Sequence, residues 1–201
     1  MLKSPIKNIH EFIATFFLVG KVPKAPGTFG TLVAAIIYYY LPRLFYIVRG
    51  ALSGITSHLP LSEGNTGGVL TGNADIMPAL DHLPLIYDSP FWLLFLIAFF
   101  FLGVYVSTQA EKTMGHDNGH IVIDEVCGYW FALYLFPPSL YYIVFGFLFF
   151  RLFDIAKPYP INKLQNLSTG WGVMVDDIMA GAYTAIVLGI IDLIWFIVKP
   201  V

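Results

Sequence analysis

Charged residues are scarce in this sequence. Of its 201 residues, 11 are Lys or Arg and 13 are Asp or Glu, so 12% are charged, whereas a soluble domain carries about 25%. The formal net charge of -2 points to neither an acidic nor a basic partner, and it excludes a nucleic-acid-binding module. A single cysteine, Cys127, excludes an internal disulfide framework and a zinc knuckle.

Apolar residues are correspondingly abundant. They make up 57% of the chain, aromatic residues make up 17%, and the mean hydropathy is +0.72. A soluble domain has about 45–50% apolar residues, and aromatic side chains suit the boundary between lipid and water. We therefore expect an all-α, polytopic integral membrane protein with one domain over residues 1–201, rather than a disordered chain or an ordinary soluble enzyme.

Four hydrophobic stretches approach the roughly 20 apolar residues that a bilayer-spanning helix needs. The third stretch is interrupted by Pro137-Pro138, which removes two backbone donors and fixes two φ angles, so it predicts a short helical hairpin. Counting the arms of this hairpin separately gives about four to five membrane helices. Whether the hairpin crosses the bilayer or only enters it stays open. The four stretches are Phe29–Val48, Phe91–Ala110, Val126–Phe153 and Ile178–Val198.

The beginning of the chain predicts an amphipathic helix that lies in the membrane interface, between residues 6 and 19. One face of that helix would be apolar, and polar residues including Lys7 and Glu11 would occupy the others. The apolar face consists of Ile6, Ile9, Ile13, Phe16 and Phe17.

Basic residues favour a cytoplasmic N-terminus, because they concentrate on the cytoplasmic side of membrane proteins. Three basic residues would then lie outside, namely Arg43, Arg49 and Lys199. Segment 50–90 contains four acids, no Lys or Arg, and many Gly, Ser, Pro and Asn residues, so we expect a polar loop insertion outside the cell rather than a second domain. Eight basic residues would lie inside: Lys3, Lys7, Lys21, Lys24, Lys112, Arg151, Lys157 and Lys163.

Five acids lie at the expected cytoplasmic ends of the hydrophobic stretches, at a similar depth. Ionised groups near hydrocarbon are costly and usually mark a functional site. Neighbouring carboxylates raise each other's pKa unless a cation neutralises them. Because the donors are all oxygen, a hard cation is expected, with Mg²⁺ preferred. The five acids are Asp124, Glu125, Asp154, Asp176 and Asp177.

Simpler structural roles are open for each acidic segment. A carboxylate at a helix N-terminus can serve only as a partner of the helix dipole, and Arg151 with Asp154 can form a purely structural ion pair. Alternatively, Arg151 and Lys157, one helical turn on either side of Asp154, are placed to clamp a phosphate.

Two loops offer further polar groups. The glycine-containing loop at residues 20–31 is suited to an anion, with Lys24 and Thr28 as candidate phosphate contacts, although the same composition is typical of an ordinary turn. The loop before Asp124 contains His116 and His120, and either could serve as a general acid or base or be an exposed loop residue.

Four segments, in this order, together resemble the phosphatidylglycerophosphatase A family: KVPKAPGTFGTL, DNGHIVIDEVCGYW, FRLFDIAKPYPI and GWGVMVDDIMAG. That family consists of bacterial inner-membrane enzymes that use Mg²⁺ to remove the terminal phosphate of phosphatidylglycerophosphate and give phosphatidylglycerol. The segments cover about a quarter of the chain, and the match extends more loosely over residues 6–198. Segment 50–90 is longer than expected for the family.

The resemblance implies roles for particular residues. The five acids would be the metal-binding and catalytic groups, and Arg151, Lys157 and the loop at residues 26–28 would bind the substrate phosphate. It also implies a phospholipid substrate, a Mg²⁺ cofactor, and a multi-pass location in the bacterial inner membrane with the active site on the cytoplasmic side. The nucleophile, either water or an Asp carboxylate, stays open.

Other functions are left open by the residues themselves. Another Mg²⁺-dependent lipid-phosphate hydrolase or a phosphotransferase would use a similar set of acids. A small cation transporter would need acids along the depth of its spans, and only Asp192 lies deep in a predicted span. The number of metal ions, the oligomeric state and the acyl-chain preference do not follow from the sequence.

Overall fold

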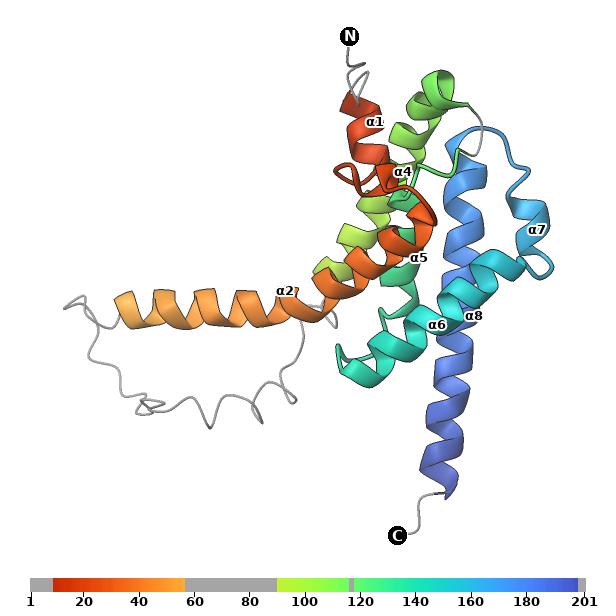
Figure 1. The fold of residues 1–201 in the computed structure, drawn as a ribbon. Helices are drawn as coiled ribbons and strands as arrows, with labels where there is room; N and C mark the ends of the chain where they lie inside the picture. Colours follow the sequence, from red (N-terminus) through yellow and green to blue (C-terminus); the bar gives the residue numbers. More distant parts are fainter. Residues whose placement is uncertain (1–8, 57–89, 116–117, 199–201) are drawn as a thin grey trace.

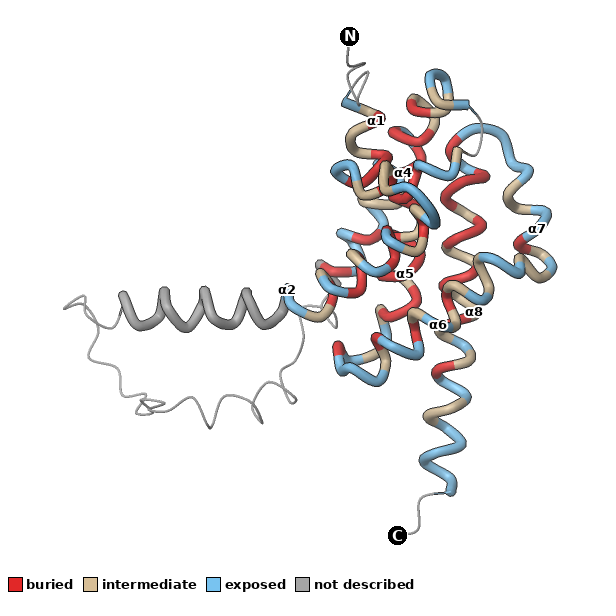
Figure 2. Tube along the Cα trace, in the orientation of Figure 1, coloured by how far each residue is buried: buried red, intermediate tan, exposed pale blue. Residues whose placement is uncertain are grey.

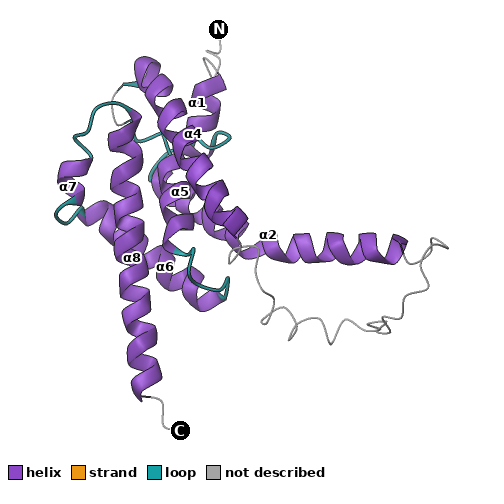
Figure 3. Cartoon of the chain, turned by 180° about the vertical axis from the view of Figure 1, so that it is seen from behind, coloured by secondary structure: helices purple, strands orange, loops and turns teal. Residues whose placement is uncertain are grey.

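The chain folds into helices, and the described part contains no strand (Figure 1; Figure 3). The computed structural model describes residues 9–56, 90–115 and 118–198. Prolines begin two of the helices, at a position where the missing backbone N–H has no helical partner to lose. The elements are α1 (Ile9–Ala14), a 3₁₀ turn η1 (Val19–Lys21), α2 (Pro26–Thr56), α4 (Pro90–Met114), α5 (Ile123–Ala132), α6 (Leu140–Ala156), α7 (Ile161–Leu164) and α8 (Gly170–Val198).

Two of the described helices are long and apolar enough to cross a membrane. These are Trp92–Met114 in α4 and Gly170–Val198 in α8, with 23 and 29 residues. At about 1.5 Å per residue, both exceed the roughly 30 Å of a bilayer core. The apolar first part of α2, Pro26–Leu41, is shorter. The total of four to five membrane helices stays a prediction.

The C-terminal half of α8 extends beyond the bundle, and most of its residues are exposed (Figure 2). Trp195 is 70% exposed and Phe196 is 80% exposed, whereas Met174 and Ala180 in the first half are buried. An uncovered apolar surface of this size indicates contact with lipid or with another protein.

Helix α5 lies in the middle of the bundle and packs against α2, α4, α6 and α8. Its ten residues extend about 15 Å, too short to cross a bilayer core. The turn that contains Pro137-Pro138 joins it to α6, as the sequence predicts. Tyr38 of α2 donates hydrogen bonds to the carbonyl oxygens of Leu133 (2.7 Å) and Phe136 (3.1 Å). These bonds join α2 to the turn that follows α5.

The N-terminal helix ends earlier than predicted. Helix α1 covers Ile9–Ala14 of the described residues and ends before the expected residue 19, and residues 1–8 lie outside the described residues. Its Glu11 is buried and accepts a 2.6 Å hydrogen bond from the Thr113 hydroxyl of α4. A polar contact therefore joins α1 to α4, while Ile9 and Phe17 of the predicted apolar face are exposed.

Two further helix boundaries differ from the prediction. Helix α2 continues to Thr56, past the expected end at Val48, and the rest of the polar segment, residues 57–89, lies outside the described residues. Helix α8 begins at Gly170, eight positions before the expected start at Ile178. Asp176 and Asp177 are therefore inside the helix rather than at its beginning.

Candidate active site

Two glycines allow α5 and α8 to cross at very short range. A Cβ atom on Gly128 would lie 2.6 Å from the carbonyl oxygen of Asp177, and a Cβ atom on Gly181 would overlap the carbonyl oxygen of Gly128. Small residues at a helix crossing let the two backbones approach closely. This crossing places the first turn of α5 beside the second turn of α8.

Three carboxylates meet at the crossing and form what we call the acidic cluster: Asp124, Glu125 and Asp177. One carboxylate oxygen from each lies within 4.8 Å of the others. In the described part of the chain, one buried oxygen of each residue also has no hydrogen-bond partner, namely Asp124 Oδ1, Glu125 Oε2 and Asp177 Oδ2. Buried acceptors are normally satisfied, and an all-oxygen set of this kind fits a hard divalent cation.

Burial and mutual repulsion disfavour ionisation of this cluster in the absence of a cation. Burial raises the pKa of Asp124 well above its usual range, and the charge of the adjacent Glu125 raises it further. Burial also raises the pKa of Glu125 to about 8, although its hydrogen bond with Asp124 and the charge of Arg151 act in the opposite direction. A bound cation would remove this conflict.

The helix dipole does not account for the two acids of α8. Asp176 and Asp177 are the seventh and eighth residues of this helix, and the stabilising effect of a helix N-terminus falls off within the first turn. Asp124 and Glu125, by contrast, lie in the first turn of α5, where the dipole contributes.

Two cations border the acidic cluster, and each is paired with another of the predicted acids. Nη1 of Arg151 lies 2.5 Å from Asp154 Oδ2 and 3.9 Å from Glu125 Oε1. Nζ of Lys157 lies 2.7 Å from Asp176 Oδ2. The structure therefore brings all five predicted acids to one region but separates them into a cluster of three and two ion pairs.

The first turn of α2 covers one side of the acidic cluster, so residues 26–31 are helical rather than part of the loop that the sequence predicts. A Cβ atom on Gly27 would overlap Glu125 Oε1 and would lie 3.1 Å from Arg151 Nη1, so a side chain there would displace these two groups. Thr28 follows in the same turn. The N-terminus of a helix favours an anion. Lys24 is exposed in the preceding loop, with a left-handed φ of 67°.

The remaining residues that the sequence singled out lie near this region with other contacts. His120 Nδ1 lies 2.6 Å from the carbonyl oxygen of Gly20 and so joins the two loops. Cys127 is buried within the hydrophobic core, one turn after Asp124. His116 lies outside the described residues.

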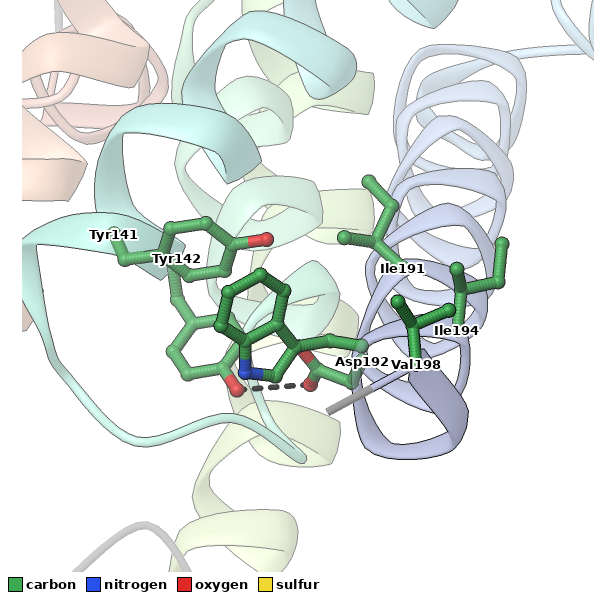
Figure 4. Close-up of a pocket in the computed structure, with 7 residues that line it drawn as sticks. Tyr141, Tyr142, Ile191, Asp192, Ile194 and Val198 are labelled. Atoms are coloured by element: carbon green, nitrogen blue, oxygen red, sulfur yellow. Dashed lines mark hydrogen bonds between the residues drawn. The ribbon is translucent and has the colours of Figure 1, made fainter. Parts of the chain in front are cut away.

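Away from the acidic cluster, a cavity of about 640 Å³ lies between α6 and the C-terminal half of α8 (Figure 4). It contains one carboxylate, that of Asp192, which accepts a 2.8 Å hydrogen bond from the Tyr142 hydroxyl. The other residues that line it are aromatic or aliphatic. This cavity therefore lacks the converging acids of the acidic cluster and the Arg and Lys side chains that border it.

A cluster of carboxylates bordered by Arg and Lys, in a helical chain with two apolar helices of membrane-spanning length, fits an enzyme that acts on phosphate groups beside a lipid phase. Comparison with known proteins identifies the family within that class. Residues 12–192 match the model of the family Phosphatidylglycerophosphatase A. The chain belongs to this family and is a phosphatase.

The sequence match to curated relatives covers most of the chain. A phosphatidylglycerophosphatase A of Escherichia coli is 37% identical over 163 residues, which cover 77% of this chain and 95% of that protein. Its counterpart from Haemophilus influenzae is 40% identical over 151 residues, covering 74% and 88%. A Bacteroides thetaiotaomicron protein, provisionally named a phosphatidylinositol-3-phosphatase, is 30% identical over 181 residues, covering 89% and 90%. No solved structure matches the chain.

The two glycines at the helix crossing were missed from the sequence, whereas Gly27 lies in the segment that the resemblance assigned to the phosphate site. Gly128 and Gly181 each permit a close approach to a backbone carbonyl that any side chain would prevent. A signal was present for both, because Gly128 and Gly181 interrupt apolar helical segments, where small residues mark helix contacts.

Proposed function

We propose that this protein hydrolyses the terminal phosphate monoester of phosphatidylglycerophosphate, with Mg²⁺, to give phosphatidylglycerol and inorganic phosphate. The observation that carries the proposal is the convergence of Asp124, Glu125 and Asp177 within 4.8 Å, with Arg151 beside them. The names of the relatives from Escherichia coli and Haemophilus influenzae support this substrate. The proposed location is the bacterial inner membrane, with the site on the cytoplasmic side.

The acidic cluster is the proposed cation site. Its residues offer oxygen donors only, and each has a buried oxygen without a protein partner in the described chain, which suits Mg²⁺ better than zinc. When bound, Mg²⁺ supplies charge neutralisation for phosphate oxygens and makes a coordinated water more acidic. Asp124, Glu125 and Asp177 would hold it.

The two ion pairs suggest a division of roles among the five acids. Arg151 presents a planar fork and Lys157 a point charge to the oxygens of a phosphate. Asp154 and Asp176 would orient these two cations, through contacts of 2.5 and 2.7 Å, rather than bind metal. Thr28, in the first turn of α2, and Lys24, in the loop before it, would contact the phosphate.

The nucleophile distinguishes two versions of this mechanism. In one, Glu125 accepts a proton from an attacking water. In the other, an Asp carboxylate attacks phosphorus, the bond between phosphorus and the ester oxygen breaks, the phosphatidylglycerol leaves with a proton on that oxygen, and a water then hydrolyses the acyl phosphate. An acid-quenched single turnover with a substrate radiolabelled in its terminal phosphate separates them, because only the attack by a carboxylate leaves the label covalently bound to the protein as a hydroxylamine-sensitive acyl phosphate.

A second substrate is favoured by one comparison. The Bacteroides thetaiotaomicron relative is named for phosphatidylinositol 3-phosphate, and it matches a larger share of this chain than the other two relatives do. Both lipids carry a phosphate monoester on a polyol head group, so the same acids and cations would act on either.

Phosphate release by the purified protein in detergent micelles tests the proposal. Each lipid is supplied separately, with Mg²⁺ or with EDTA, to the wild type and to Asp124→Asn. We expect Mg²⁺-dependent release from phosphatidylglycerophosphate that Asp124→Asn abolishes. Faster release from phosphatidylinositol 3-phosphate would assign the second substrate. A folded wild type that released phosphate from neither lipid would contradict both proposals.

A further inference from the structure

An apolar groove lies between α4, α5 and α8, and two of these helices, α5 and α8, also carry the acidic cluster. Its volume is about 240 Å³, and every residue that lines it is apolar apart from the thiol of Cys127. The residues used below are Leu93, Ile97 and Phe101 of α4, Cys127 and Phe131 of α5, and Ile178 of α8.

Two helices carry residues of both the groove and the acidic cluster. On α5, Asp124, Cys127 and Phe131 are spaced by three and four residues and therefore share one face. On α8, Ile178 directly follows Asp177. A single molecule could thus place a charged end at the carboxylates and an apolar part against Cys127 and Phe131.

The shape of the groove suits a flexible chain. Its floor is buried, with Leu96 3% exposed and Cys127 1% exposed, whereas its rim is open, with Ile97 46% and Phe101 54% exposed. Between Leu93 and Phe101 it follows α4 for about 12 Å. The open rim faces outward from α4, one of the two helices long enough to span a bilayer, so the groove is accessible from the lipid phase.

Aromatic side chains border the end of the groove nearest the acids. The Trp171 ring of α8 contacts Phe100 and Phe101 edge-on, with centroid separations of 5.8 and 6.1 Å. Trp171 is 43% exposed, and tryptophan favours the level where lipid head groups meet acyl chains. This position agrees with a polar head at the acidic cluster and a hydrocarbon chain below it.

We propose that this groove binds an acyl chain of the lipid substrate and thereby positions the phosphate at the acidic cluster. The proposal rests on the function proposed above and deepens it, because it assigns the part of the substrate that does not react. Binding of a remote, unreactive part of a substrate contributes to the rate at the reacting centre.

A pair of tryptophan substitutions on the exposed side of α4 tests the groove. Ile97→Trp fills the groove from its rim, and Leu94→Trp, at a residue that is 63% exposed and does not line the groove, is the matched control. Each protein is assayed with diacyl phosphatidylglycerophosphate and with its water-soluble deacylated form. We expect Ile97→Trp to lower kcat/KM for the diacyl lipid about tenfold, without changing kcat/KM for the deacylated form, and Leu94→Trp to change neither.

Equal losses on both substrates, or no loss on either, would overturn the groove proposal. A wild type inactive on both substrates would instead contradict the proposed function, and a labelling experiment then tests the groove independently of turnover. The probe is a phosphatidic acid that carries a diazirine on one acyl chain, crosslinked in micelles and located by peptide mapping. Labelling concentrated on Phe131 and its neighbours, and reduced by Ile97→Trp, would support the groove, whereas labelling spread evenly over exposed apolar helices would overturn it.

Discussion

Helix α8 carries carboxylates near both ends, and the two regions differ in how the protein accommodates the charge. Asp177 lies inside the bundle, within 4.8 Å of two further acids, and has an unpartnered buried oxygen among the described residues. Asp192 lies fifteen positions later, about 22 Å along the helix axis. It is a lone acid in the exposed half of α8, and the Tyr142 hydroxyl donates a hydrogen bond to it.

This difference separates a functional arrangement from a structural one. A buried acceptor without a partner costs about 1–3 kcal/mol, and more if it is charged, and like charges held together add to that cost. Such an arrangement persists where function requires it. An acid whose neighbour donates a hydrogen bond avoids most of that cost, and so Asp192 needs no ligand to account for its place.

The largest expected effect is on phosphatase activity. Asp177→Asn should lower phosphate release about a thousandfold, because a lost metal ligand removes several kcal/mol of transition-state stabilisation. Asp192→Asn, on the same helix, should change activity by less than about twofold, as a substitution away from the site. Both rates are measured in micelles with saturating Mg²⁺, after the helical circular dichroism and a cooperative unfolding transition confirm that the variants fold. A comparable loss in Asp192→Asn would remove the distinction between the two regions and favour a path of acids through the membrane.

Metal binding should also distinguish the acidic cluster from the region around Asp192, in an experiment that needs no substrate. A ligand at a hundred times its Kd stabilises the folded protein by about 2.7 kcal/mol, so Mg²⁺ should raise the thermal unfolding midpoint of the wild type. Asp192→Asn should respond as the wild type does, and Asp124→Asn should not respond. A Mg²⁺ response that persists in Asp124→Asn would mean that the cation binds outside the acidic cluster.

Two of the glycines of α8, Gly181 and Gly189, provide a third comparison between the same regions. Gly181→Ala should destabilise the protein by about 1–3 kcal/mol, because its Cβ would overlap the carbonyl oxygen of Gly128 and force α5 away from α8. Gly189→Ala places its Cβ in open space, and alanine there should stabilise the helix by up to about 1 kcal/mol. Unfolding midpoints in detergent measure both. Equal shifts in the two variants would mean that the crossing is not tightly packed.

Local signals in the sequence predicted much of this arrangement. Pro137-Pro138 predicted the hairpin because a proline acts on its own backbone, and the charged residues stood out because their surroundings are apolar. The spacing of Arg151 and Asp154 by three residues likewise indicated a possible pair.

The interactions that the sequence did not predict depend on how distant helices meet. Lys157 reaches Asp176, nineteen positions away, and the close crossing at Gly128 and Gly181 determines which three acids converge. The early start of α8 was missed because its first eight residues are less apolar than the stretch that follows. Hydropathy alone therefore placed the beginning of the helix too late.

The smallest expected effect concerns the partner of Asp192. Tyr142→Phe removes the hydroxyl that donates the 2.8 Å hydrogen bond and should lower stability by about 1 kcal/mol, with phosphatase activity unchanged. A double-mutant cycle with Asp192→Asn measures the coupling through the unfolding midpoints of the wild type, the two single variants and the double variant. If the pair is structural, the two changes will be non-additive in stability and silent in activity. Additive changes would show that Asp192 relies on another group, and a loss of activity would show that the exposed half of α8 takes part in the reaction.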